Sequence, residues 1–489
     1  MLSDSSRRDP RGGGFLRRLR LWATIAVLFA IGYFGWVKFE WSRPTATLRQ
    51  PLQFLGKHAE IPLDVADWGT GLASLDVSID AGGTRYQVLS ESYPAASWRG
   101  SGIHEKSFTL AVAPSDAKIP EGPAKLTVTA RDGSWLNFLV SRPPTLVQPI
   151  QIDYTPPSVE VLTTQHYMRL GGSDMVIYKT SKDAVRSGVV VEQYFFPGTK
   201  GLLPDADIAA AIFAVPQDLT PAARPKVVAE DAAGNRREAG FFVSVKPRKF
   251  AERTLDVNDD FLKRKVPGLL EINHLAATDD LLAGYLAINR SLRTQSEETI
   301  RKVCSHSEPK MLWSEVFLRQ PDSAPLSSFA DRRTYKHDGT VIDSQTHLGF
   351  DLASLRQSPV VAENNGKVVF AENLGIYGNV VILDHGLGLF SLYGHLSSIG
   401  VAVGQSVQRG DSLGRTGETG LAAGDHLHFS IMVDGIHVDP IEWWDPKWVA
   451  DHVTEKLKSF ENPATTAAAG APPASAPPPE TGHRGRHRR

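Results

Sequence analysis

The chain opens with an apolar run and then switches between short alternating segments and glycine- or proline-rich breaks. Leu21–Val37 is almost continuously apolar, and its length is at the lower end of what crosses a bilayer as a helix. From Thr45 to about residue 245, segments such as Ala73–Asp80 and Ala124–Ala130 alternate apolar and polar residues. A period of two is typical of β-strands with one buried face. We therefore predict a mainly β protein behind an N-terminal apolar helix.

The alternating region divides in two. Asp153–Pro157 contains two successive prolines, which a central strand does not tolerate, so we place a junction there. This predicts two β-sandwiches, 45–150 and 151–248. Lys125–Gly133 and Lys226–Asn235 are each a strand that runs into a turn containing Gly and Asp or Asn, which suggests that the two domains are related. Such domains resemble bacterial immunoglobulin-like modules.

The apolar period changes after residue 248. Asp279–Arg290 and Ser296–Cys304 place apolar residues at helical spacing, with acidic starts and basic ends. We predict a helical connector at 249–325, followed by a β-rich domain at 326–446 with many glycine turns. Residues 447–489 are predicted to hold the end of a helix and a disordered, basic tail rich in Ala and Pro.

The N-terminal run carries a targeting signal. Six arginines precede it within residues 1–20, and the positive-inside rule keeps such a flank in the cytoplasm. We expect a single-pass anchor at 21–37 in the inner (cytoplasmic) membrane, with the rest of the chain on the periplasmic side. A cleavable signal peptide is the alternative, but Lys38–Trp41 follows the run without a small-residue cleavage site.

Composition narrows the chemistry. The 489 residues are 42% hydrophobic and 22% charged with a formal net charge of −1, so no overall positive field favours nucleic acid, and we predict no nucleic-acid partner. Cys304 is the single cysteine. It excludes an internal disulfide and a thiolate-rich zinc site, so any metal must be held by histidines and carboxylates.

Two histidine-bearing segments have spacings that suit a metal. In the strand-like run that begins at His426, His426 and His428 point to the same face, about 7 Å apart. His347 and Asp351 also share a face if their segment is extended. Together with one imidazole of the pair they supply three protein ligands, which leaves a fourth zinc position open for water. Each motif alone is weak, because paired histidines are often merely hydrogen-bonded.

The wider sequence resembles the lysostaphin-type (LytM-like) zinc endopeptidases from about Ser328 to Trp444. The resemblance rests on several ordered matches, among them His347-Leu-Gly-Phe-Asp351, Tyr377-Gly-Asn-Val-Val-Ile, Leu392-Tyr-Gly-His395-Leu-Ser and Gly424-Asp-His-Leu-His-Phe429. It implies an antiparallel β-sheet peptidase domain with zinc (Zn²⁺) on His347, Asp351 and His428. It also implies that His395 and His426 are catalytic without being ligands. Members of this family cut peptide cross-links of bacterial peptidoglycan.

One position departs from the family pattern. Ser430 stands where the family usually has Glu, on the predicted metal face, and its loss would alter the surroundings of the ligands rather than ligation itself. His385, in a glycine turn of the motif, is a candidate neighbour of the site. His58, His104, His166 and His274 lack partners at useful spacing, so we expect structural roles for them.

These features predict a zinc metalloendopeptidase that hydrolyses the stem-peptide cross-links of peptidoglycan during wall remodelling. A glycosidase normally needs two carboxyl groups at the bond, and here the metal uses Asp351. Two other functions stay open. One is a catalytically silent regulator that activates a separate wall amidase, and the other is an adhesin-like anchor whose sandwiches bind protein partners. The sequence does not say which catalytic histidine is the acid and which the base.

Overall fold

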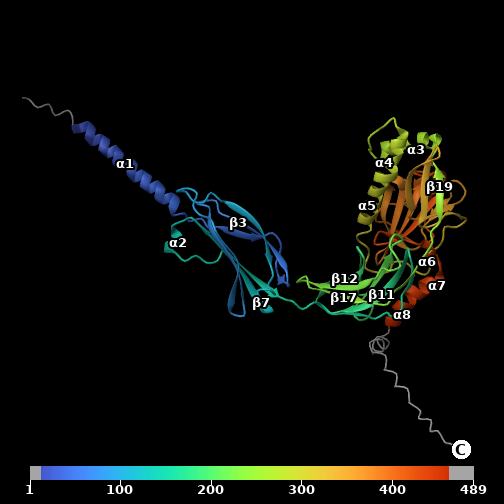
Figure 1. Ribbon diagram of the computed structural model, residues 1–489, viewed down its shortest axis with the longest axis horizontal. Helices are drawn as coiled ribbons and strands as arrows, with labels where there is room; N and C mark the ends of the chain where they lie inside the picture. The colour runs from blue at the N-terminus through green and yellow to red at the C-terminus, as the bar shows by residue number, and fades with distance from the viewer. Residues whose placement is uncertain (1–12, 462–489) are drawn as a thin grey trace, which may run out of the picture. The chain divides into compact units, whose positions relative to one another are not determined.

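The computed structural model describes residues 13–461 (Figure 1). The chain folds as two compact units. The first runs to Pro156 and includes Asp231–Asn235, and the second comprises Pro157–Glu230 and the chain from Arg236 onward. The arginines of the predicted cytoplasmic tail that precede Gly13, and the predicted tail after Glu461, lie outside the described residues.

Helix α1 (Gly13–Lys38) contains the predicted anchor and is longer than it. It begins before Arg17, Arg18 and Arg20, because arginine is a good helix former and does not end a helix. Its part Arg17–Lys38 is 22 residues long and is long and apolar enough to cross a membrane, by length and composition. Side chains from Arg17 to Phe34 are exposed, as expected of a helix whose apolar surface is covered by something other than this chain.

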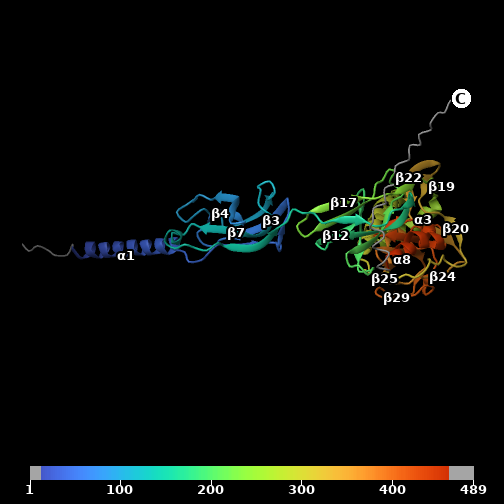
Figure 2. The ribbon, with the colours of Figure 1, turned by 90° about the horizontal axis from the view of Figure 1, so that it is seen from below.

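Two sheets follow α1 and share one core. The first sheet has the order β1-β3-β6 and the second β2-β8-β7-β4-β5. Figure 2 labels β3 of the first sheet and β4 and β7 of the second. Their bounds are β1 Thr45–Leu48, β2 Phe54–Leu55, β3 Ala59–Ala66, β4 Leu72–Ala81, β5 Thr84–Ser92, β6 Glu105–Val112, β7 Gly122–Asp132 and β8 Leu146–Ile152, and the short helix α2 spans Leu136–Leu139. Alternate residues of β3, namely Ile61, Leu63 and Val65, are fully buried. The alternation of apolar and polar residues in this strand therefore corresponds to one buried face.

A second pair of sheets opens the second unit, with the orders β14-β15-β11-β9 and β13-β12-β16-β17, and β10 pairs with β18. The bounds are β9 Val159–Val161, β10 Tyr167–Arg169, β11 Gly172–Thr180, β12 Ala184–Val191, β13 Tyr194–Pro197, β14 Thr199–Lys200, β15 Ile208–Val215, β16 Lys226–Asp231, β17 Arg236–Gly240 and β18 Ser244–Lys246. Asp132 ends β7 and Asp231 ends β16, and both accept hydrogen bonds from the turn that follows. The predicted echo between the two regions thus has a structural counterpart.

The connector begins with a strand that the sequence did not indicate. β19 (Glu252–Asp256) pairs in parallel with β21 (Asp331–His337) before α3 (Asp259–Ile272), α4 (Leu281–Ala287), a π-helical turn (Ile288–Leu292) and α5 (Arg293–Val303). All five residues of β19 are exposed, so the strand has no buried face for a pattern to reveal. The two runs predicted to be helical, Asp279–Arg290 and Ser296–Cys304, fall in α4, the π-helical turn and α5, whereas α3 lies outside both runs. Side-chain caps at Asn258 and Asp280 start α3 and α4.

An antiparallel sheet forms the centre of the C-terminal region, with the order β20-β23-β31-β27-β26-β25-β29 and β32 on β31. The bounds are β20 Ala324–Ser327, β22 Thr340–His347, β23 Phe350–Ala353, β24 Pro359–Val361, β25 Gly366–Asn373, the 3-10 turn η2 Gly375–Tyr377, β26 Asn379–Gly386, β27 Leu389–Leu396, β28 Ser398–Ile399, β29 Ser406–Val407, β30 Ser412–Arg415, β31 Leu427–Val433 and β32 Ile436–Val438. The chain then forms α6 (Pro440–Trp444), α7 (Pro446–Val449), a π-helical turn (Ala450–Thr454) and α8 (Glu455–Glu461).

Both faces of this sheet are covered. Ile431 and Val433 of β31 belong to a core shared with β11 and β15, whereas Met432 belongs to a core shared with α3, α4 and α5. Because side chains alternate along a strand, His428 and Ser430 lie on the same face as Met432. The metal-side residues of β31 therefore face the helical connector.

Candidate metal centre and active site

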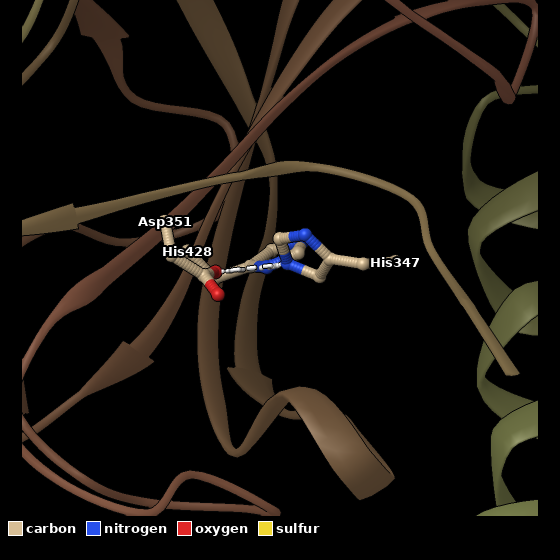
Figure 3. Close-up of side chains that lie close together, drawn as sticks. All are labelled: His347, Asp351 and His428. Atoms are coloured by element: carbon tan, nitrogen blue, oxygen red, sulfur yellow. Dashed lines mark hydrogen bonds and ion pairs between the residues drawn. The ribbon is translucent and has the colours of Figure 1, made fainter. Parts of the chain in front are cut away.

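Three side chains from neighbouring strands meet in one buried cluster (Figure 3). His347 is the last residue of β22, while Asp351 in β23 is the direct partner of His428 in β31. His347 Nε2 lies 2.9 Å from Asp351 Oδ1 and 3.0 Å from His428 Nδ1, and His428 Nδ1 lies 3.0 Å from Asp351 Oδ1. The three residues are 3–6% exposed. The structure thus brings together the three residues that the sequence predicted as ligands.

The outer hydrogen bonds of the two imidazoles fix which nitrogens carry protons. His347 Nδ1 donates to the Ser328 carbonyl at 3.1 Å, so its Nε2 presents a lone pair. The Ser430 hydroxyl donates to the Leu348 carbonyl at 2.9 Å and therefore accepts from His428 Nε2 at 3.2 Å. His428 Nδ1 is then also unprotonated.

Two nitrogen lone pairs and a carboxylate oxygen consequently point at one another with no proton between them. Such an arrangement is repulsive unless a cation lies among the three atoms. The distances fall slightly below the roughly 3.3 Å that separates ligand atoms around a tetrahedral ion with bonds of about 2.0–2.1 Å. The cluster therefore fits a metal ion that accepts imidazole and carboxylate ligands.

Arg333, which the sequence did not identify, holds the carboxylate ligand. From β21 its guanidinium donates to Asp351 Oδ2 at 3.0 Å and to Ser327 Oγ at 2.9 Å, which leaves Oδ1 for the cluster. Burial alone would raise the pKa of Asp351, but the adjacent imidazoles of His347, His426 and His428 hold it well below its usual value. The carboxyl group is therefore ionised at neutral pH.

Ser430 explains how this chain manages without the usual glutamate. Its hydroxyl links His428 to the Leu348 carbonyl and so fixes the imidazole tautomer and ring direction. The sequence showed that the residue is unusual. Its partner could not be deduced, because Leu348 lies 82 positions away in the chain.

His395 and His426 stand beside the cluster without belonging to it. His395 Nδ1 donates to the Thr419 carbonyl at 2.9 Å and His426 Nδ1 to the Gly424 carbonyl at 2.8 Å, so both Nε2 atoms present lone pairs. Their ring centroids are 4.8 Å apart, and His426 Nε2 is 3.6 Å from Asp351 Oδ1. His395 adopts a φ of +63°, a strained conformation that is typical of functional sites.

The pKa values of His395 and His426 are shifted in opposite directions. Burial, together with His426 and His428, holds the pKa of His395 well below its usual value. Burial also lowers the pKa of His426, but Asp351 outweighs this effect and raises it. A pair of neighbouring imidazoles with separated pKa values suits proton transfer in two directions.

These groups line a cleft of about 410 Å³. Besides the five predicted residues, its walls include Leu255, Phe261 and Tyr285 of the connector. Tyr377 packs its ring 5.1 Å from that of His428 and donates its hydroxyl to Glu297 of α5 at 2.6 Å. The connector thus forms part of the site, which the sequence did not indicate, because its helical pattern shows which face is buried but not against what.

Other histidines lie elsewhere. His385, predicted as a neighbour of the site, instead hydrogen-bonds the Asn365 carbonyl and Ser391 Oγ and does not line the cleft. That prediction was wrong, because alternation in β26 directs the side chain to the face of the sheet opposite the cleft. His166 has the structural role expected of it, buried between Asp174 and Thr163.

Comparison with known proteins agrees with this geometry. The profile of the family described as "Peptidase family M23" matches residues 345–440. Residues 345–440 form a peptidase family M23 domain. The M23 domain contains all five predicted site residues, together with Ser430 and Tyr377.

The two curated relatives compared next match over a segment about as long as this domain. The DD-carboxypeptidase/endopeptidase Mpg of Neisseria meningitidis is 38% identical over 95 residues, 19% of this chain and 22% of its own. Peptidoglycan DD-endopeptidase ShyA of Vibrio cholerae is 38% identical over 96 residues, 20% of this chain and 22% of its own. The match spans about a fifth of these curated relatives. The catalytic domain of the antimicrobial peptidase lysostaphin from Staphylococcus simulans is 28% identical with a TM-score of 0.22, covering 25% of this chain and 92% of that domain.

Proposed function

We propose that this protein is a zinc-dependent endopeptidase that hydrolyses peptide cross-links of bacterial peptidoglycan. The observation that carries the proposal is the convergence of three proton-free ligand atoms, from His347, Asp351 and His428, beside two further imidazole lone pairs in an M23 cleft. Histidine and carboxylate without thiolate suit zinc. Three protein ligands leave a position for water or substrate.

The ion supplies Lewis-acid chemistry when bound, because it polarises a carbonyl group and lowers the pKa of water. The chain's own residues do the rest. His395, which is neutral at pH 7, offers Nε2 as a proton acceptor or as an orienting group for water. His426, which is more readily protonated, donates to a developing oxyanion or to the leaving amine. Assigning acid to His426 and base to His395 is part of the proposal.

The substrate class follows from the relatives and the site. Mpg and ShyA are named as endopeptidases, and ShyA as one that acts on peptidoglycan. The cleft of this chain is lined by Arg293, whose guanidinium donates to the Asn289 side chain rather than to a carboxylate, and such a positive group suits stem peptides that carry free carboxylates. We assign the substrate as cross-linked stem peptides, attacked at the amide bond.

Helix α1, which is long and apolar enough to cross a membrane, supports a location at a membrane. We propose that α1 is an uncleaved, single-pass anchor of the inner membrane and that both sandwiches and the M23 domain are periplasmic. The sandwiches, which resemble immunoglobulin-like modules in pattern, are then available to hold the M23 domain away from the bilayer and to contact protein partners. The activator alternative predicts the same location without zinc-dependent hydrolysis.

Digestion of purified sacculi tests the proposal. Zinc-loaded protein should release new free amino groups and reduce the amount of cross-linked dimers, with no new reducing sugar ends. Chelation should stop both changes. Products with new reducing ends would show a glycosidase, release of intact stem peptides would show an amidase, and no product at all would favour the activator alternative.

A further inference from the structure

A second group of convergent carboxylates lies at the point where the anchor helix meets the first unit. Glu40 follows α1 by two residues, Asp67 lies in the loop between β3 and β4, and Asp132 ends β7. One oxygen from each lies within 4.8 Å of the others. Asp67 and Asp132 are 1% and 3% exposed, and Glu40 is partly buried.

Hydrogen bonds account for much of this cluster but not for all of it. Glu40 accepts from the Thr70 amide at 2.6 Å and from the Ser42 hydroxyl. Asp132 accepts from the Ser134 amide, Asn137 and Arg142. Asp67 Oδ2 accepts from the Gly71 amide at 2.7 Å. Asp67 Oδ1 is buried and accepts no hydrogen bond from the residues that the structure describes.

A second oxygen without a partner belongs to the same loop. Thr70 is 4% exposed, and its Oγ1 has no hydrogen-bond partner among residues 13–461, while its amide donates to Glu40. Its side chain lies against Gly133, the residue after Asp132. A hydroxyl that is neutral and buried normally finds a donor or acceptor, so two orphaned oxygens in one loop indicate a missing partner.

The charges of the cluster do not balance. Arg142 pairs with Asp132 at 2.7 Å, and in the part of the chain that the structure describes no other lysine or arginine forms an ion pair with the three carboxylates. Three carboxylates and one guanidinium leave a charge of −2 in a mostly buried place. Burial, and then the charges of Glu40 and Asp132, raise the pKa of Asp67, so repulsion from the neighbouring carboxylates adds to the cost of burying its charge.

We propose that Asp67, Glu40, Asp132 and the hydroxyl of Thr70 form a calcium site that fastens the anchor helix to the first unit. Only oxygen ligands are present, which favours Ca²⁺ over zinc. A divalent cation cancels the excess charge and provides a partner for both orphaned oxygens. Calcium accepts the irregular, multi-oxygen geometry of a loop more readily than Mg²⁺, which requires a near-ideal octahedron.

The proposed calcium site strengthens the connection between the end of α1 and the first unit. The Lys38 carbonyl already accepts from the Trp135 amide at 2.8 Å, and Phe39 and Phe34 pack on the Trp135 ring. A cation bound by Glu40 and Asp67 adds a bridge from the helix end to the β3–β4 loop. Calcium therefore stiffens the joint between α1 and the first unit, where Figure 1 shows α2 beside the helix end.

Calorimetric titration of the full, zinc-loaded chain in detergent micelles with CaCl₂ tests this site. We expect one calcium ion per chain beyond the zinc, at least a tenfold weaker affinity in Asp67→Asn and Glu40→Gln, and no change in Asp116→Asn, which alters an exposed acid of the same unit. Calcium should also raise the midpoint of thermal unfolding of the wild type but not of Asp67→Asn.

Folding of the variants is checked without calcium, where Asp67→Asn should be at least as stable as the wild type because it removes repulsion between carboxylates. Glu40→Gln provides a second, less buried variant. The proposal is overturned if the wild type takes up no calcium at ~10 mM, a concentration above the range of weak extracellular sites. It is equally overturned if Asp67→Asn and Glu40→Gln bind calcium as the wild type does.

Discussion

His347 and His428 each donate a hydrogen bond from one ring nitrogen to an oxygen, and the other ring nitrogen is unprotonated. These two tautomers define the candidate metal site. Neutral imidazole has one proton to give. On His347, Nδ1 carries this proton and donates it in a hydrogen bond to the Ser328 carbonyl. On His428, Nε2 carries it and donates to the Ser430 hydroxyl. Residues outside the coordination shell therefore decide which atoms face the metal.

The ligand set predicts the metal content of variants. His428→Ala should lose stoichiometric zinc, because two remaining protein ligands do not retain the ion. Elemental analysis of purified protein measures this, with exposed His58→Ala as a matched control that keeps its zinc. Unchanged zinc in His428→Ala would remove this residue from the ligand set.

His395 and His426 should behave differently from the ligands. His395→Ala and His426→Ala are each expected to keep zinc and to lose hydrolysis by about 10²–10⁴-fold, the usual range for a general acid or base. Metal content and rate are measured on the same preparation. Loss of zinc in either variant would make that histidine a ligand, and full activity would exclude it from the mechanism.

At the scale of elements, connector helix α5 supports the site through Glu297. Its carboxylate accepts from the Tyr377 hydroxyl at 2.6 Å and from His437 Nε2 at 3.1 Å, and Tyr377 packs on His428. Burial alone would raise the pKa of Glu297, but His437, Tyr377 and Arg293 together lower it to about 2.

This shift predicts how stability depends on pH. A carboxyl group whose pKa is about 2 in the folded state and about 4.3 in the unfolded state stabilises fully above the unfolded value. The stabilisation, about 3 kcal/mol, is lost as pH falls from about 4.3 toward 2. Urea unfolding at several pH values measures this dependence. As pH falls from about 4.3 toward 2, the free energy of unfolding should decrease less in Glu297→Gln than in Glu298→Gln, whose exposed side chain makes it a matched control. An equal decrease in both variants would contradict the stabilising role of Glu297.

The sequence predicted the features that depend on the alternation of residues within one strand. It missed the features that depend on which strands pair with one another. The common face of His426 and His428 follows from alternation within one strand, and the structure places both at the cleft. Arg333 reaches Asp351 only because β21 pairs with β22, and β19 exists only because β21 is beside it. Neither strand pairing can be deduced from the local pattern of apolar and polar residues.

At the scale of the whole molecule, the second pair of sheets and the M23 domain share one hydrophobic core. Trp443 of α6 is fully buried and its indole donates to Ser173 Oγ of β11. Lys456 of α8 pairs with the buried Asp174 of the same strand. Two domains that the sequence separated at residues 248 and 326 are therefore built as one unit.

Calorimetry of the full chain should consequently show two unfolding transitions rather than three. Trp443→Ala should destabilise the transition that contains the M23 domain by about 3–5 kcal/mol, the usual cost of removing a buried tryptophan. Zinc should raise the midpoint of that same transition. A third transition, or an effect of Trp443→Ala on a transition that zinc does not shift, would contradict a shared core.

The most direct test of the central claim uses a purified cross-linked muropeptide dimer in ¹⁸O-water. Zinc-loaded protein should convert the dimer to two monomers, with one ¹⁸O atom in the newly formed carboxyl group and one new amino group. Chelation should stop the reaction, zinc should restore it, and His395→Ala should be inactive with its metal still bound. A dimer that stays intact with zinc-loaded protein, or that is cut equally well after the metal has been removed, would contradict the account.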